Sequence, residues 1–288
     1  MGEYDDTFAI TPMSQKLMLE AGEVYEGTVK VFAPAHAEKN FPYKVEVAPY
    51  GVAADGYEAD LVTESERTKI VDWITIDEPL GTLKPNESKE IHYTIKVPET
   101  APAGGQYAAI MVGSDERDDS NASGMNVKAV YEMASIIYAT VNGDIVREGK
   151  IQLNEVPGFV TAMPVKVMVE LENKGNIHET AKIQLKVKNF LTGAELYPTE
   201  GDDGAMEEVV MPETSRVVMR EVRDLPALGI YEVAQNVDYM GKHSSVTQLM
   251  IACPVWFMVM VAVVLGVIIA GVVIAIKKHR KKKTAAEY

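Results

Sequence analysis

The feature that most constrains this chain is an unbroken apolar run of 22 residues, Val255–Ile276, near its C-terminus. No charged residue occurs anywhere between Ser244 and Ile276. At 1.5 Å per residue a helix of that length measures about 33 Å, close to the ~30 Å thickness of a hydrocarbon core. A core helix of a globular protein would show a polar face. The sequence therefore predicts a transmembrane helix, assigned to residues 251–276.

The segment after this run predicts the orientation. Lys277–Tyr288 holds six basic residues and one acidic residue, while the rest of the chain holds 22 basic and 41 acidic ones, a net charge of -19. Short basic flanks stay in the cytoplasm, so residues 277–288 are expected inside as a tail that attracts anionic lipid, and the N-terminal domains outside. An acidic body is unsuited to a phosphate backbone, so no nucleic-acid partner is expected.

The N-terminus is expected to be processed. An extracellular portion of this size needs a signal peptide, but Met1–Ile10 has neither a basic nor an apolar segment of the required kind. We therefore expect that Met1 is not the native start or that the signal peptide is absent from this chain.

Small residues mark one face of the predicted helix. Ala262, Gly266 and Ala270 follow each other at intervals of four, which permits close helix–helix approach and suggests a homo-oligomer. The lone Cys253 excludes an intrachain disulfide and any site built from several cysteines. It is interpreted as an apolar filler or as one half of an intermolecular disulfide.

The preceding residues alternate between apolar and polar side chains, which is typical of antiparallel strands with one wet face. Strands are predicted at 26–32, 43–48, 91–97, 107–113, 127–139, 165–171, 183–187, 216–222 and 229–238. Only Leu61–Val71 suggests a short helix or turn.

The spacing of these strands and of their proline and glycine turns predicts a mainly β protein with two tandem immunoglobulin-like β-sandwich domains followed by the single transmembrane helix. The domains are assigned to residues 8–148 and 149–243, after a flexible N-terminus at 1–7.

No motif predicts catalysis. The five histidines are scattered, and neither a nucleophile elbow nor a phosphate-binding glycine loop occurs. We expect no catalytic residue, no cofactor and no metal site. The acidic segment Ser114–Gly124 is predicted to be a hairpin tip, with a calcium site as the alternative, although it lacks EF-hand spacing.

Aromatic side chains are the candidate ligand surface. Tyr50 and Tyr57 bracket a glycine-containing loop and are expected to be exposed. Trp73 is interpreted as a core residue or as a platform on which a sugar stacks. An edge strand that accepts a partner's strand is a further route to binding.

Four segments carry turn and strand motifs: Phe8–Pro12, Gly22–Gly27, Asp72–Ile76 and Leu83–Met111. Together they resemble the first domain of the WxL-interacting proteins, which are surface proteins of Gram-positive-type bacteria. The resemblance implies two immunoglobulin-like domains, one transmembrane helix and a basic tail, with peptidoglycan binding by the first domain and host-surface binding by the second. The segment Glu172–His178 looks more like generic bacterial cell-surface repeats, so the wall-facing role is the one carried over.

We therefore expect a non-enzymatic, membrane-anchored bacterial cell-surface protein that acts in adhesion or binds peptidoglycan or another surface protein. The alternative is an accessory ectodomain subunit of a membrane protein complex. An envelope hydrolase or chaperone is a third, weaker hypothesis.

Overall fold

The computed structural model describes residues 9–33, 40–53, 57–114, 132–198 and 204–284, with side chains of the C-terminal helix described as far as Lys277. The chain divides into two compact units. Unit 1 comprises residues 1–150 together with the short segments 172–179 and 209–216, and unit 2 comprises the remainder. The two short segments were expected in the second domain, but their contacts place them in unit 1.

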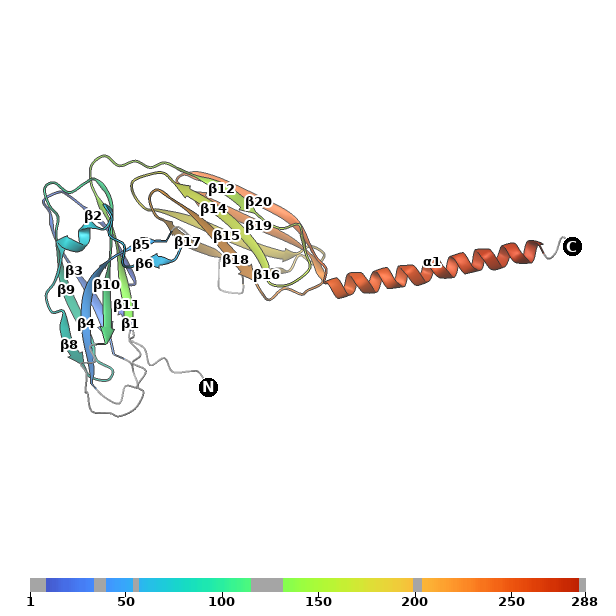
Figure 1. Ribbon diagram of the computed structural model, residues 1–288, viewed down its shortest axis with the longest axis horizontal. Helices are drawn as coiled ribbons and strands as arrows, with labels where there is room; N and C mark the ends of the chain where they lie inside the picture. The colour runs from blue at the N-terminus through green and yellow to red at the C-terminus, as the bar shows by residue number, and fades with distance from the viewer. Residues whose placement is uncertain (1–8, 34–39, 54–56, 115–131, 199–203, 285–288) are drawn as a thin grey trace. The chain divides into compact units, whose positions relative to one another are not determined.

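Unit 1 is a sandwich of two sheets (Figure 1). The four-stranded sheet has the order β1-β3-β9-β7 and the five-stranded sheet the order β2-β11-β10-β4-β8. The bounds are β1 Ala9–Thr11, β2 Ser14–Leu19, β3 Val24–Phe32, β4 Phe41–Pro49, β7 Ile74–Ile76, β8 Leu80–Leu83, β9 Ser88–Lys96, β10 Gly104–Ser114 and β11 Glu132–Val141. A small pair, β5 Gly51–Val52 and β6 Ala59–Asp60, and a 3₁₀ helix, η1 Lys69–Trp73, complete it.

The alternation of side chains produces the sandwich. On β9, Ile91, Tyr93 and Ile95 are buried while His92 and Lys96 are exposed. Their partners in the same core come from both sheets, so the two apolar faces pack against each other. The predicted short helix or turn at 61–71 overlaps η1 only at its end, Lys69–Val71, and a turn lies at Glu66 and Arg67.

The first strands of unit 1 were not predicted. The chain pairs antiparallel with β3 through β1, then crosses at Pro12 and Met13 and pairs parallel with β11 through β2. Proline has no N–H for a ladder, which suits it to the crossing point between two sheets. One short segment thereby supplies an edge strand to each sheet.

Unit 2 is also a sandwich. A three-stranded sheet has the order β12-β14-β18, and a six-stranded sheet has the order β13-β20-β19-β15-β16, with β17 also paired to β15. The bounds are β12 Gly149–Glu155, β13 Phe159–Val160, β14 Val165–Asn173, β15 Glu179–Asn189, β16 Glu195–Tyr197, β17 Ala205–Val210, β18 Thr214–Val222, β19 Gly229–Tyr239 and β20 Lys242–Ala252. Val167, Leu185 and Val233 lie in its core, fully or almost fully buried.

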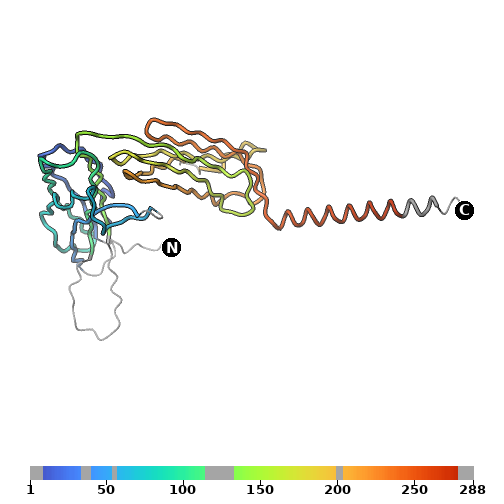
Figure 2. Tube along the Cα trace, turned by 45° about the horizontal axis from the view of Figure 1, so that its top comes forward, coloured from blue at the N-terminus to red at the C-terminus, as the bar shows by residue number. Residues whose placement is uncertain are grey.

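The chain runs from β20 into the C-terminal helix α1, Val255–Thr284, through only two residues (Figure 2). Two assigned boundaries are corrected here. Ile251 and Ala252 belong to strand β20, because they pair with Ile230 and Gly229 of β19, so they do not begin the helix. The second β-sandwich likewise extends beyond 243, to Ala252.

The fold class predicted from sequence is confirmed: the chain is mainly β, with two immunoglobulin-like sandwiches followed by one helix. Within the described residues, the segment Val255–Lys277 is the one helical stretch long and apolar enough to cross a membrane. The expected flexible residues 1–7, strand residues 127–131 and nearly all of the hairpin tip 114–124 lie outside the described residues.

Candidate binding surfaces

Trp73 lies at the end of η1 and is 9% exposed. It packs in the core of unit 1 with Ile70 and Ile74. Of the two interpretations given to it, the structure places it in the core, because the 3₁₀ turn directs Ile70 and Trp73, three residues apart, to the same side. Its ring offers no exposed platform for a sugar.

Tyr57 is half-buried rather than exposed. Its hydroxyl accepts a hydrogen bond from the Met211 N–H at 2.5 Å and lies 3.3 Å from the Thr214 hydroxyl oxygen. The Arg216 guanidinium sits 4.6 Å from the centroid of its ring. Burial raises the pKa of the Tyr57 hydroxyl. The expectation of a free, exposed Tyr57 is therefore wrong, because segment 209–216 of unit 1 occupies both the ring and the hydroxyl.

Tyr50 is half-buried too and belongs to an aromatic cluster in unit 1. Its ring meets Tyr138 edge-on at 5.7 Å, and the Tyr138 hydroxyl donates to the Tyr50 hydroxyl at 3.3 Å. Tyr138 in turn contacts Tyr107 at 6.0 Å and His178 at 5.1 Å. Edge-on aromatic contacts of this kind add to the stability gained from burial alone. The exposure expected for Tyr50 is therefore also incorrect.

His178 contributes the imidazole of this cluster. Its backbone N–H donates to the Tyr107 hydroxyl at 2.8 Å, and its ring lies 5.6 Å from the Tyr107 ring. Burial, together with the positive charges of Lys16 and Arg147, lowers the pKa of His178 to about 4. Its imidazole is therefore neutral near pH 7.

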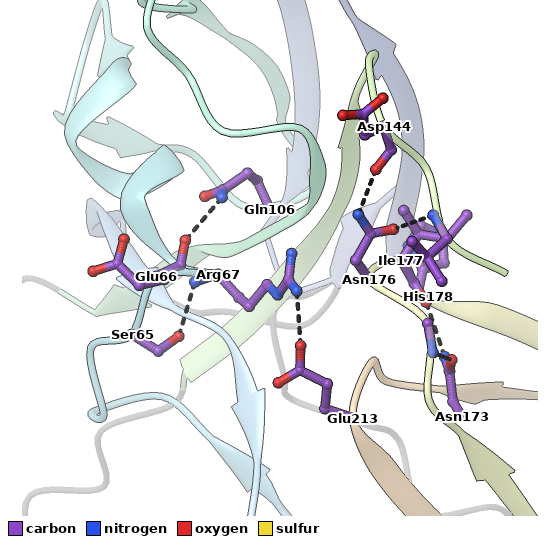
Figure 3. Close-up of polar contacts among 12 residues, drawn as sticks. Ser65, Glu66, Arg67, Gln106, Asp144, Asn173, Asn176, Ile177, His178 and Glu213 are labelled. Carbon is purple, nitrogen blue, oxygen red and sulfur yellow. Dashed lines mark hydrogen bonds and ion pairs between the residues drawn. The ribbon is translucent and has the colours of Figure 1, made fainter. Parts of the chain in front are cut away.

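Near the aromatic cluster, polar side chains bind other side chains and backbone groups (Figure 3). Arg67 pairs with Glu213 at 3.0 Å. The Gln106 amide donates to the Glu66 carbonyl at 2.9 Å. The side chain of Asn176 donates to the Asp144 carbonyl at 2.7 Å and accepts from the Val146 N–H at 2.8 Å. Each of these side chains is therefore engaged by another side chain or by a backbone group.

The sequence interpretation did not identify two residues of the aromatic cluster, His178 and Met211, or two residues of the adjoining polar contacts, Asn176 and Glu213. A local signal exists for Asn176: asparagine beside glycine in a turn typically hydrogen-bonds nearby backbone. Its partners, however, are some thirty residues away in the sequence.

The described residues contain no cluster of metal-ligating side chains. No group of three or more His, Cys, Asp or Glu side chains lies there in a position to hold a metal ion. His243 pairs with Asp238 at 2.8 Å, but both side chains are exposed on the β19–β20 hairpin.

Strand β20 presents an open edge. The Ile251 N–H donates to the Gly158 carbonyl at 2.9 Å, on the side facing β13, so the backbone groups of the odd-numbered residues of β20 point away from β19. β13 pairs only with Ile251 and Ala252. Within the described residues, the backbone groups of His243, Ser245 and Thr247 are thus left without strand partners, and such an edge can accept an added strand.

The proposed helix-packing face is Ala262, Gly266 and Ala270 on α1, and all three residues are exposed. A Cβ added at Gly266 would meet no atom within 4 Å. Cys253, in the connection between β20 and α1, is a half-buried free thiol.

Comparison with known proteins shows distant similarity of structure only. No protein family matches the sequence, and no curated protein matches it. The class 5 fimbriae chaperone CfaA is 16% identical with a TM-score of 0.40, over 85% of this chain and 99% of that one. The Escherichia coli chaperone DraB is 14% identical with a TM-score of 0.37, over 84% and 96%. The CsuC–CsuE chaperone–tip adhesion subunit complex of Acinetobacter baumannii is 15% identical with a TM-score of 0.37, over 84% and 98%.

Similarity at this level assigns no family. The fold itself defines the class: a tandem β-sandwich protein whose last strand leads directly into one helix apolar enough to cross a membrane.

Proposed function

We propose that this chain is a membrane-anchored, non-enzymatic cell-surface protein of a bacterium, which binds a component of the cell envelope or acts in adhesion. The observation that carries the proposal is the direct passage from the sandwich to the apolar segment Val255–Lys277. The acidic body and the basic tail support an orientation with the sandwiches outside and the tail in the cytoplasm. The resemblance to the WxL-interacting proteins supports the same assignment.

The partner in this proposal is peptidoglycan or another surface protein. The aromatic side chains of the candidate ligand surface, Tyr50, Tyr57 and Trp73, are engaged in packing. The edge of β20, by contrast, has no strand partner among the described residues at His243, Ser245 and Thr247. We therefore favour a protein partner that adds a strand along β20, with peptidoglycan as the other outcome of the test.

The test is capture by the full chain reconstituted in nanodiscs, with isolated peptidoglycan and with solubilised surface proteins offered separately. Thr247→Pro removes an outward N–H that β19 does not use, whereas Thr247→Val keeps it. Strand addition predicts that Thr247→Pro weakens capture of a surface protein at least tenfold while Thr247→Val does not. Retention of neither material would refute the proposal, and equal capture by both variants would refute binding at this edge.

The uncovered helix face supports a second candidate function, an accessory subunit whose helix packs against another membrane protein or another copy of itself. Native mass measurement of the detergent-extracted chain tests it. A complex of defined stoichiometry that is lost on Gly266→Leu but kept on Val264→Leu, on the opposite side of the helix, supports this role. A monomer in the native extract would contradict it.

A further inference from the structure

Three loops of unit 2 lie at the end where the chain passes into α1. The first, Val156–Pro164, joins β12 to β14 and pairs Phe159 with Ile251 of β20. The second, Phe190–Ala194, follows Asn189, which pairs with Tyr231 of β19. The third, Arg223–Leu228, joins β18 to Gly229 of β19, which pairs with Ala252. The last residues of β20 thus share one end of unit 2 with all three loops.

The first two loops contain no charged residue, and the third contains none after Arg223 and Asp224. Their sequences are Val-Pro-Gly-Phe-Val-Thr-Ala-Met-Pro, Phe-Leu-Thr-Gly-Ala and Arg-Asp-Leu-Pro-Ala-Leu. Charged residues make up 24% of the chain, but in these three loops they are confined to Arg223 and Asp224, next to the end of β18. At the opposite end of the β19–β20 hairpin, β20 begins with Lys242 and His243.

Each loop also exposes a large apolar side chain. Phe159 is 52% exposed, Phe190 54%, Leu191 76% and Leu228 47%. Other apolar residues of the same loops, Val156 and Leu225, point into the core of unit 2. The outward side chains are therefore not needed to fill the core, and a cluster of this kind marks an interaction surface.

Hydrogen bonds hold the loops in place as one surface. The Phe190 N–H donates to the Ile230 carbonyl at 2.9 Å, linking the second loop to the start of β19. The Asn189 side chain accepts from the Leu191 and Thr192 N–H groups, both at 3.0 Å. The Cys253 N–H donates to the Val160 carbonyl at 2.9 Å, which ties the first loop to the connection with α1. The exposed side chains are therefore presented on ordered backbone.

The connection to α1 limits how far this end can lie from a membrane. Only Cys253 and Pro254 separate β20 from the helix, so Ala252 lies at most about 11 Å from Val255 whatever the direction of the helix. The 23 residues of the apolar segment span about 34 Å, only slightly more than a ~30 Å hydrocarbon core. Val255 must then lie near the boundary of the hydrocarbon, and the end of unit 2 within reach of the headgroup layer.

We propose that Phe159, Phe190, Leu191 and Leu228 form a lipid-binding surface, the membrane-contact patch, that inserts into the interfacial layer of the outer leaflet. This inference rests on the proposed membrane anchoring. Aromatic and aliphatic side chains are favoured at the boundary between headgroups and acyl chains. The short connection makes lipid the occupant, because it holds the patch beside the bilayer at all times. The patch fixes unit 2 against the membrane in addition to the helix.

The test measures the depth of a nitroxide label in the full chain, reconstituted into vesicles of phosphatidylcholine and phosphatidylglycerol. Each label is placed on one new cysteine in a Cys253→Ser background. Leu191→Cys and Phe159→Cys report on two loops of the patch. Val217→Cys is the matched control, because Val217 is 50% exposed on β18, about five residues from the strand end nearest the patch. Val264→Cys reports on the helix itself.

Insertion predicts that labels at 191 and 159 collide several-fold less often with a water-soluble nickel complex than the label at 217, and more often with oxygen, which concentrates in lipid. Equal nickel access at 191 and 217 would place the patch in water and overturn the inference. Low access to both reagents at 191 would show that protein covers the patch, which also overturns it. In either case, a label at 264 that is protected from nickel would show that the helix still spans the membrane and that only the patch is refuted. If the label at 264 were open to nickel, the anchor and the patch would both be refuted.

Discussion

The packing of Tyr93 over Gly27 gives the sharpest test of how unit 1 is held together. The two residues are directly paired across β3 and β9. A Cβ placed on Gly27 would lie 2.3 Å from the Cζ of Tyr93 and 2.4 Å from its hydroxyl oxygen. Tyr93 is 1% exposed, and its hydroxyl donates to the Gln15 side chain at 2.9 Å. The ring therefore fills the space that any larger residue at 27 would need.

Gly27→Ala forces the ring to move by roughly an ångström in a close-packed core, which costs about 1–3 kcal/mol of unfolding free energy. Tyr93→Ala costs about 3–5 kcal/mol through lost burial and the cavity left behind. In the Tyr93→Ala background the clash is gone, and Gly27→Ala gains about 0.5–1 kcal/mol because alanine loses less backbone entropy in a strand. The effect of Gly27→Ala on the unfolding free energy thus changes sign between the two backgrounds, and the coupling free energy between positions 27 and 93 is about 1.5–4 kcal/mol.

The assay is urea unfolding of the full chain followed by the fluorescence of Trp73, which lies in the core of unit 1. Trp256 is replaced by Phe in every variant so that one tryptophan reports. Gly81→Ala, which would place its Cβ 2.4 Å from the Cζ of Tyr43, should repeat the destabilisation. The reasoning is refuted if Gly27→Ala costs the same with and without the Tyr93 ring, or costs nothing in either background.

Three further predictions concern other parts of the chain. Burial lowers the pKa of His178 from 6.5 to about 4. As the pH falls from 6.5 to 4, the unfolded chain therefore takes up the proton before the folded chain does, and unit 1 should lose roughly 3 kcal/mol of stability. His178→Asn should remove most of this pH dependence when unfolding is followed by the fluorescence of Trp73. Tyr231→Phe removes the hydroxyl that donates to the Pro226 carbonyl at 2.5 Å and should cost about 1 kcal/mol, measured by hydrogen exchange of β19; no change in exchange would count against that bond. Leu185→Ala, at a fully buried site, should cost about 2–5 kcal/mol by the same measurement, and a cost under about 1 kcal/mol would contradict its core position.

Sequence reasoning located strands best where one face is buried and the other is wet. The alternation in Ile91–Val97 and Val165–Leu171 predicts strands that the structure contains as β9 and β14. It missed β20, because Lys242–Gln248 is polar on both faces and the strand is defined by its pairing with β19. It also missed β1 and β2, which are short and depend on two different remote partners.

The candidate aromatic residues show the limit of the same reasoning. Tyr50 and Tyr57 flank a glycine-containing loop, which typically means exposure. Their surroundings are instead set by Tyr138 and by Met211 and Arg216, more than eighty and one hundred and fifty residues further along the chain. No local pattern encodes a partner at that separation.

By itself the sequence determined the apolar helix, the division of charge around it and the β-sandwich class. Those properties depend on neighbouring residues. A helix forms its backbone hydrogen bonds within one segment, and the alternation of side chains along a strand shows which face is buried. Only the tertiary structure decided which tyrosines are engaged, which strand edge is open, and that three loops with exposed apolar side chains gather beside the start of α1. Each of these depends on strand pairing between distant segments, and pairing is fixed by the joint packing of the whole sandwich rather than by any one stretch of it.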